Sequence, residues 1–246
     1  MSDGVVVGVV GPDTGDVERA VREAGGVPDP GAATDVTSEG SFVVAVGEPA
    51  LLAVARAGPD VPVLPVAAGH GVRSVPREAV DAAAGALLAD EFDRETHPVM
   101  AIRAADRTTA RALQDVMLAS GEPAQISEYT VRTGGERVAR FRADGVVLAT
   151  PAGSPGYARS AGGPVVPPEA DVLAAVPVSP FATDVDHWVV PLGDVTVAVE
   201  RDRTDVQLVA DDRVVGLVDP DEPIRVSPAD SLSVVVVEAS RSPFDR

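Results

Sequence analysis

The stretch from Asp144 to Pro168 combines residue types that can hold a ligand. It opens with an apolar, β-branched run typical of a buried strand and continues with small or turn-forming residues. A loop with so little side-chain bulk lets backbone amides approach a ligand closely. Tyr157 adds an aromatic face. The same composition is also typical of a tight surface turn, and residue type alone leaves both interpretations open.

The N-terminal part of the chain alternates strand and helix patterns, which predicts a parallel α/β sheet with right-handed crossovers. The predicted strands cover residues 5–10, 42–46 and 61–66, and the predicted helices cover 16–24, 51–57 and 76–89. Ligand sites in such sheets lie at the carboxyl ends of the strands. Here those ends are Gly11-Pro12, Gly47 to Ala50 and Ala67 to Gly71. No GxGxxG follows the first strand, so a dinucleotide fingerprint is not supported.

The pattern changes at Asp90 to His97, a polar segment expected to link two domains. Beyond it, strand-like runs separated by Gly, Asp and Pro predict a β-rich, sandwich-like domain, with Gly134-Gly135 as a hairpin turn. The predicted fold is therefore α/β plus all-β. We expect a parallel-sheet α/β domain over residues 1–95, a β-rich domain over 96–232, and a C-terminal strand or tail over 233–246 that returns to the first domain.

The charge balance is strongly acidic. The chain has 38 acidic and 20 basic residues, a net charge of −18, and all its basic residues are arginine. This charge disfavours nucleic acid and anionic membranes as partners. Dispersed acids suit a salt-rich cytoplasm that screens self-repulsion, so we expect a halophilic, haloarchaeal-type protein. No apolar run approaches the roughly 20 residues that span a bilayer, and no basic segment precedes the first strand, which predicts a cytoplasmic location.

Few residues of this chain could ligate a metal. Cysteine is absent, which excludes disulfides and thiolate sites. The three histidines, His70, His97 and His187, lack metal-ligand spacing, so no metal-ligating residues are predicted. His70 follows a predicted strand and is the histidine most worth testing.

Taken in order, these features resemble the NAD kinase family. The resemblance rests on an apolar strand followed by Gly47-Glu48, a later Leu113-Gln114-Asp115, and DGVVLATPAGSPGYARSAGGPVVPP from Asp144 onward. It implies transfer of a phosphoryl group from ATP or polyphosphate, with Mg²⁺ or another divalent metal, to the 2′-hydroxyl of the adenosine ribose of NAD, giving NADP. It also implies that the first domain holds the phosphate donor, that the β-rich domain holds NAD, and that the protein is a homodimer or homotetramer.

Glu48 stands where the family has its catalytic aspartate, which implies a general base one methylene longer. The resemblance places the donor phosphates at Gly47 and Ala50. Two glycines and a threonine of the family pattern are missing, and Pro49 removes a backbone donor, so a cradle built from amides should be weaker. Glu48-Pro49 is equally typical of the first turn of a helix, and both roles stay open.

The resemblance implies a set of NAD-binding residues in the β-rich domain. Gln114 and Asp115 stand where the family has an Asn-Glu pair that holds adenine and ribose, although alone they are typical of a solvated surface pair. Asp144, Tyr157 and Ser160 match other contact positions, and Tyr157 is equally typical of a half-buried core residue. The remaining predicted contacts are loop residues, of which the second, fifth and sixth depart from the family pattern: Thr150, Ala152, Gly153, Ser154, Pro155 and Gly156.

Three functions follow from this pattern. The first is a working NAD kinase with Glu48 as base, possessing a degenerate donor loop. The second is a catalytically inactive paralogue that binds NAD or NADP and acts as a sensor or oligomer partner. The third is a related kinase with another acceptor, such as a lipid or a sugar. The acceptor side matches the family better than the donor side, which argues against the third function. A preserved acceptor loop beside a degenerate donor loop also fits the second function, and the first is favoured by a small margin.

Overall fold

The structure is a computed structural model that describes residues 4–36, 40–104, 107–121, 125–182, 185–201, 205–220, 222–242 and 244. The chain forms two compact units. One contains Met1–His97 and Ser231–Arg246, and the other contains Pro98–Asp230. The expected combination of an α/β part and a β-rich part is confirmed. Within the described ranges, no helix has the length and apolar character needed to cross a bilayer.

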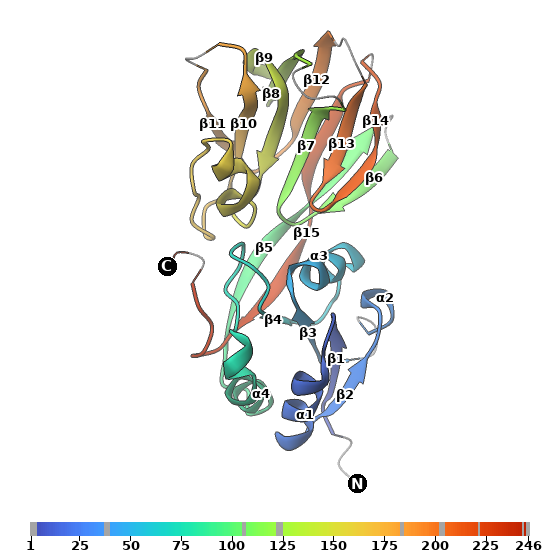
Figure 1. The fold of residues 1–246 in the computed structure, drawn as a ribbon, viewed down its shortest axis with the longest axis vertical. Coiled ribbons are helices and arrows are strands. Elements are labelled where there is room, and N and C mark those ends of the chain that lie inside the picture. The colour runs from blue at the N-terminus through green and yellow to red at the C-terminus, as the bar shows by residue number, and fades with distance from the viewer. Residues whose placement is uncertain are drawn as a thin grey trace. The chain divides into compact units, whose positions relative to one another are not determined.

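The first unit is built on a parallel sheet with the order β2-β1-β3-β4-β15 (Figure 1). Its strands are short and almost fully buried, except β2 at the edge, as expected for a sheet covered on both faces. Strands that run parallel bring their carboxyl ends to one edge, so the loops after β1, β3 and β4 are neighbours. The strands are β1 (Val6–Val10), β2 (Val27–Pro30), β3 (Phe42–Val46), β4 (Val63–Val66) and the end of β15 (Ile224–Val236).

Helices cover this sheet in two pairs. In Figure 1, α1 lies with α4, and α2 lies with α3. Apolar residues at helical spacing in α1, such as Val17 and Val21, are buried in the core of the unit with Ala83 and Leu87 of α4. The helices are α1 (Gly15–Glu23), α2 (Ala33–Val36), α3 (Glu48–Ala57), the 3₁₀ turn Arg77–Ala79 and α4 (Val80–Leu88).

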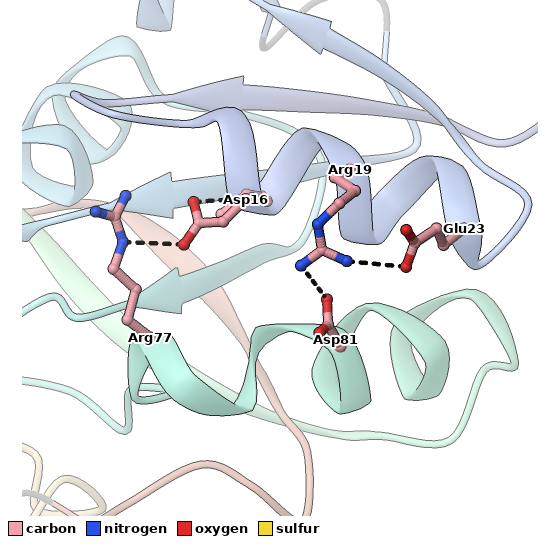
Figure 2. A network of polar contacts seen from close by, with 6 residues as sticks. Asp16, Arg19, Glu23, Arg77 and Asp81 are labelled. Carbon is pink, nitrogen blue, oxygen red and sulfur yellow. Dashed lines mark hydrogen bonds and ion pairs between the residues drawn. The ribbon is translucent and has the colours of Figure 1, made fainter.

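Exposed ion pairs link the outer surfaces of α1 and α4 (Figure 2). Arg19 contacts Glu23 and Asp81, each at 2.9 Å, and Arg77 lies 3.3 Å from Asp16. Arg77 also donates to the carbonyl oxygens of Pro12 and Asp13 in the loop after β1. The Arg19 pairs join α1 to α4, whereas Arg77 connects the β1–α1 loop to the 3₁₀ turn before α4.

One local prediction in the first unit is wrong. The segment from Gly31 to Gly40, whose polar residues predict a loop, contains α2, and the exposed strand β2 before it was not predicted. Proline is tolerated in β2 because this strand lies at the sheet edge, where it needs fewer ladder donors. The polar segment from Asp90 to His97, expected to link two domains, ends where this part of the first unit ends, and β5 (Asp93–Ala104) begins inside it and continues into the second unit.

The second unit is all-β among its described residues apart from one helical turn. The strand order β14-β13-β7-β9-β8-β12-β15 is extended by β10 and β11 beside β9, and by β5 and β6 beside β15. Gly134 and Gly135 form the expected hairpin turn between β8 and β9. The strands are β6 (Arg107–Ala112), β7 (Asp115–Ser120), β8 (Ser127–Thr133), β9 (Glu136–Ala149), β10 (Val172–Pro180), β11 (Trp188–Pro191), β12 (Val195–Arg201), β13 (Val206–Ala210) and β14 (Arg213–Val218).

Strand β9 organises this unit. Its first half pairs with β8, and its second half lies between β7 and β10. The main core packs on one side and includes Tyr129, Phe141 and Leu148. A smaller cluster forms where the chain after β9 folds back and buries Ala158 and Val166 against β9 and β10. The loop predicted to bind a ligand is therefore anchored to the sheet by its own apolar residues.

Candidate functional site

The carboxyl edge of the first sheet holds Gly47 and Glu48. Gly47 follows β3, has φ of +87° and occupies the N-cap position of α3. This backbone conformation is one that glycine adopts without strain. Glu48 is the first residue of α3, and Pro49 follows in the first turn. The helix-start geometry expected for Glu48-Pro49 is thus present, with the carboxylate at the helix N-terminus, where the macrodipole favours negative charge.

Few amide donors remain in this loop for a phosphate group. The N–H of Gly47 donates to the carbonyl oxygen of Val66 at 2.8 Å, and Pro49 has no N–H. The first bond of the helix runs from the Leu51 N–H to the Gly47 carbonyl oxygen, at 3.1 Å. Of residues 47–50, Gly47 uses its N–H in the bond to Val66, and Pro49 has no N–H. The N–H groups of Glu48 and Ala50 have neither restriction.

The neighbouring loops pack tightly around Glu48. Gly11, after β1, has φ of +135°, and a side chain there would overlap the carbonyl oxygen of Val46. Gly69, after β4, has φ of +79°, and a Cβ placed on it would lie 2.9 Å from a carboxylate oxygen of Glu48. Both positions therefore require glycine, which fixes the loops after β1 and β4 against the Gly47-Glu48 turn.

A cavity of about 310 Å³ lies beside this turn within the first unit. His70 and Arg241 line it, together with Ser74, whose buried hydroxyl accepts a hydrogen bond from the Ala68 N–H at 2.9 Å. Arg241 also pairs with Glu78 at 2.9 Å. The C-terminal segment reaches the cavity through a β-bridge between Ser74 and Arg241. The cavity is small, is lined by both apolar and polar residues, and lies at the strand ends where α/β sheets bind ligands.

In the second unit, the turn before β7 is held by a carboxylate. Asp211 accepts hydrogen bonds from the N–H groups of Leu113 (3.1 Å), Gln114 (2.7 Å) and Asp115 (3.2 Å). Its own N–H donates to the Asp115 carbonyl oxygen at 2.9 Å, and its φ is +50°. Three amides converging on one carboxylate fix the backbone of Gln114 and Asp115, whose side chains are half-buried.

The loop after β9 is built directly on this turn. Thr150 donates its hydroxyl between the carbonyl oxygens of Leu113 (2.6 Å) and Gln114 (3.0 Å), and its N–H bonds Gln114 at 2.9 Å. Gly153 packs so closely that a Cβ would overlap the Gln114 carbonyl oxygen. The structure therefore brings Gln114, Thr150 and Gly153 together, and only glycine fits at position 153.

The loop divides into an interior layer and an exposed layer. Thr150, Ala152, Gly153 and Ser154 are buried. The Ser154 hydroxyl donates to the Pro151 carbonyl oxygen and accepts from the Val166 N–H, both at 2.8 Å. These side chains shape the loop and do not reach solvent. The predicted contacts that a ligand can reach through their side chains or open backbone are half-buried Pro155 and exposed Gly156, Tyr157 and Ser160.

Asp144 lies apart from these residues. It precedes Ala149 by five positions on β9, about 16 Å along an extended strand. Its carbonyl oxygen accepts the O–H of Tyr129 at 3.4 Å. Burial raises the pKa of Tyr129 to about 12, and the nearby Asp144 carboxylate adds to this rise, so the phenol stays protonated and can donate. The structure gives Asp144 no contact with the Gln114 turn.

The residue that sequence reasoning missed is Asp211. The resemblance to the family treats Asp211-Asp212 only as a departure from Asp-Gly. An aspartate at a hairpin turn commonly bonds backbone amides, and that was the available signal. Its partners in the Leu113–Asp115 turn are distant in sequence, so the three bonds could not be predicted from local pattern.

The described residues contain no group of three or more His, Asp or Glu side chains positioned to hold a metal ion. Mg²⁺ commonly keeps several waters and binds phosphate oxygens of its substrate.

Comparison with known proteins points to one family. Residues 113–238, just over half of the chain, match the model of the ATP-NAD kinase C-terminal domain. A NAD kinase of Methanosarcina acetivorans is 34% identical over 116 residues, covering 47% of this chain and 42% of the relative. One of Symbiobacterium thermophilum is 37% identical over 137 residues, covering 55% and 44%. The matched region thus spans less than half of these relatives' length.

Two solved structures share the fold over nearly the whole chain. An NAD kinase from Archaeoglobus fulgidus in complex with ATP has a TM-score of 0.77 at 23% identity and is covered to 94% by 95% of this chain. Yeast NADH kinase complexed with NADH has a TM-score of 0.79 at 18% identity and is covered to 85% by 97% of this chain. With the family model matching the region that contains the Gln114 turn and the Thr150 loop, this chain belongs to the NAD kinase family.

Proposed function

We propose that this chain is an NAD kinase that transfers a phosphoryl group from ATP or polyphosphate to the 2′-hydroxyl of NAD. The observation that carries this proposal is the loop after β9, which is clasped onto the Gln114 carbonyl by Thr150 and Gly153. The same loop exposes Gly156, Tyr157 and Ser160, and the Gln114-Asp115 turn on which it rests is fixed by Asp211. It lies in the region matched by the family model, and the relatives named above are NAD or NADH kinases.

In this proposal Glu48 acts as the general base. The ribose oxygen attacks the terminal phosphorus of the donor, and the bond from that phosphorus to the bridging oxygen breaks, which releases ADP or the shortened polyphosphate. The hydroxyl proton passes to the Glu48 carboxylate. Bound to the donor phosphates, Mg²⁺ or another divalent metal would supply neutralisation of their negative charge. Gln114, Asp115 and Tyr157 hold the acceptor NAD, and any contact of Asp144 with NAD is with a part of it away from the Gln114 turn.

A catalytically inactive NAD(P)-binding paralogue is the second candidate. The scarcity of amide donors after β3 favours this candidate, because the Gly47 N–H already donates to the Val66 carbonyl oxygen and Pro49 has no N–H. With one N–H engaged and another missing, the loop offers phosphates fewer donors than a loop in which every amide is available. We further propose that the protein is cytoplasmic and, from its charge of −18, that it works in high salt. The resemblance to the family supports a homodimer or homotetramer.

The deciding experiment is NADP formation by the purified chain from NAD, Mg²⁺ and either ATP or polyphosphate in molar KCl. We expect turnover, and we expect Glu48→Gln to lower kcat by about 10²- to 10⁴-fold, because the change removes the base but nearly preserves shape. A Glu48→Gln variant as active as the parent would exclude Glu48 as the base.

The same preparation separates the alternatives. NAD or NADP binding by calorimetry without turnover of either donor would favour the inactive paralogue. ATP consumption with a lipid or sugar acceptor, in the absence of NAD turnover, would favour a kinase with another acceptor. Absence of both binding and turnover would overturn the proposal.

A further inference from the structure

Three neighbouring strands of the second unit place two arginines on either side of a threonine. Thr196 of β12 is paired with Arg132 of β8 on one side and with Arg225 of β15 on the other. Residues paired across adjacent strands point to the same face of a sheet. With strands about 4.8 Å apart, the two arginine Cα atoms lie about 10 Å apart, with the threonine between them. Both guanidinium groups can therefore reach one group placed over the hydroxyl.

A hollow of about 350 Å³ opens at this point, and Arg132, Thr196 and Arg225 line it. The Gly134-Gly135 turn forms another part of its wall, with Thr133 and Asp194. Both glycines have positive φ, and a Cβ at either would meet nothing within 4 Å. The turn therefore leaves the hollow open to small solutes.

The arginines of this hollow differ from those elsewhere in the chain. Arg19, Arg73 and Arg111, for example, each lie within 3 Å of a carboxylate. In the part of the chain that the structure describes, Arg225 makes no ion pair, and Arg132 bonds only the Gly135 carbonyl oxygen, at 3.5 Å. Arg137 of β9 is paired with Arg132 and adds a third positive charge to the row. In a chain of net charge −18, arginines gathered on one face make that face locally positive and favour an anionic partner.

We propose that Arg132, Thr196 and Arg225 form a binding site for a phosphate oxyanion, either free or as the phosphate group of a small molecule. The guanidinium fork matches phosphate oxygens in a bidentate manner, and the threonine hydroxyl supplies a further donor at the centre. Asp194 is the acid that lines the hollow, and it weakens anion binding by repulsion. The site is separate from the loop at Thr150–Ser160, because the hairpin turn precedes β9 and that loop follows it, with the 14 residues of the strand between them.

Pyrophosphate, orthophosphate and a phosphomonoester are the probes that test this site, without NAD or ATP present. Two-dimensional NMR of the full chain at low salt should show shifts of the amides of Arg132, Thr196 and Arg225. Calorimetry should show that the Arg132→Gln/Arg225→Gln variant loses about tenfold or more in affinity, since each arginine supplies charge-assisted bonds. Stronger binding of the phosphomonoester than of orthophosphate would indicate an organic phosphate as the ligand, and the reverse order would indicate free phosphate.

Two matched variants control this test. Arg213→Gln makes a single charge change on exposed β14 of the same unit and should leave pyrophosphate affinity nearly unchanged. Asp194→Asn should raise the affinity severalfold by removing the repelling charge, and it keeps the proposal testable if the double variant fails to fold. Amides of the three residues that do not shift at millimolar pyrophosphate would overturn the proposal. So would a loss in Arg213→Gln as large as that in the double variant.

Discussion

The loop after β3 and the loop after β9 both follow a buried strand and are rich in glycine and proline, yet they are built in different ways. After β9, the hydroxyls of Thr150 and Ser154 bond backbone groups inside the protein, and the loop rests on the Gln114 carbonyl. After β3, Gly47 caps α3 without any side-chain bond. The loop after β9 is preorganised by its own side chains, whereas the loop after β3 depends on its neighbours, Gly11 and Gly69.

This difference suggests where each half of the proposed reaction is strong. A preorganised loop binds a ligand without a further cost of ordering, so the acceptor side should bind NAD well. In the loop after β3, the Gly47 N–H donates to Val66 and Pro49 has no N–H. Contacts to donor phosphates should therefore be weaker there. Variants that act on one loop and spare the other can break or sharpen this comparison.

The largest effect should come from Gly153→Ala. The added Cβ overlaps the Gln114 carbonyl oxygen, so the loop must move away from the turn on which it rests. We expect a loss of about 3 kcal/mol in the free energy of unfolding and a loss of NAD binding. Gly216→Ala, on exposed β14 of the same unit, meets nothing within 4 Å and is the control. Denaturant unfolding measures the stability of both variants, and calorimetry measures their NAD binding. Equal stability of the two variants would contradict the close packing of position 153 against the Gln114 carbonyl oxygen.

Gly153 and Gly156 also mark how far the sequence alone can go. Both are glycines in a small-residue loop, and nothing local separates them. What separates them is the Gln114 carbonyl, which tertiary folding brings to position 153. The parallel sheet, α1 and the hairpin at Gly134-Gly135 were predictable because period and turn chemistry are local signals.

The missed elements lacked such signals. Strand β2 contains two prolines in four residues and is exposed, so it has neither apolar alternation nor a continuous apolar run. The start of β5 is polar because much of it is exposed. Asp211 was missed as a site residue for the reason that applies to Gly153: its three partner amides lie on a turn that is remote in sequence. Sequence pattern thus located the loops but not the contacts that fix them.

The next effect in size should come from Asp211→Asn. The amide side chain keeps one acceptor oxygen but loses the charge and the second acceptor that together hold the amides of Leu113, Gln114 and Asp115. We expect a loss of about 2 kcal/mol in the free energy of unfolding, together with weaker NAD binding, since the Gln114 turn is loosened. Asp212→Asn, at the exposed neighbouring position, is the control. Unchanged NAD affinity of the Asp211→Asn variant would show that the Leu113–Asp115 turn is not part of the NAD site.

Tyr157→Ala should act on binding rather than on folding. Tyr157 is 47% exposed, so its removal uncovers little buried surface. If the ring stacks on a base of NAD, its loss should weaken NAD binding by about 1 kcal/mol, roughly fivefold, and Tyr157→Phe should restore the affinity. Calorimetry of both variants measures the effect. A change in unfolding free energy as large as that in binding would instead make Tyr157 part of the core.

The smallest effect should come from Arg19→Gln, which tests the surface of the first unit away from either loop. Arg19 bridges Glu23 and Asp81 between α1 and α4, and its pKa is raised first by Asp81 and then by Glu23 (Figure 2). All three side chains are about half exposed or more, so water and salt screen the pairs. We expect a small drop in Tm at low salt that disappears in molar KCl, measured by thermal unfolding against Arg22→Gln, which alters an ion pair within α1 alone. A drop that persists in molar KCl would mean that Arg19 stabilises the first unit by packing across the two helices rather than by charge.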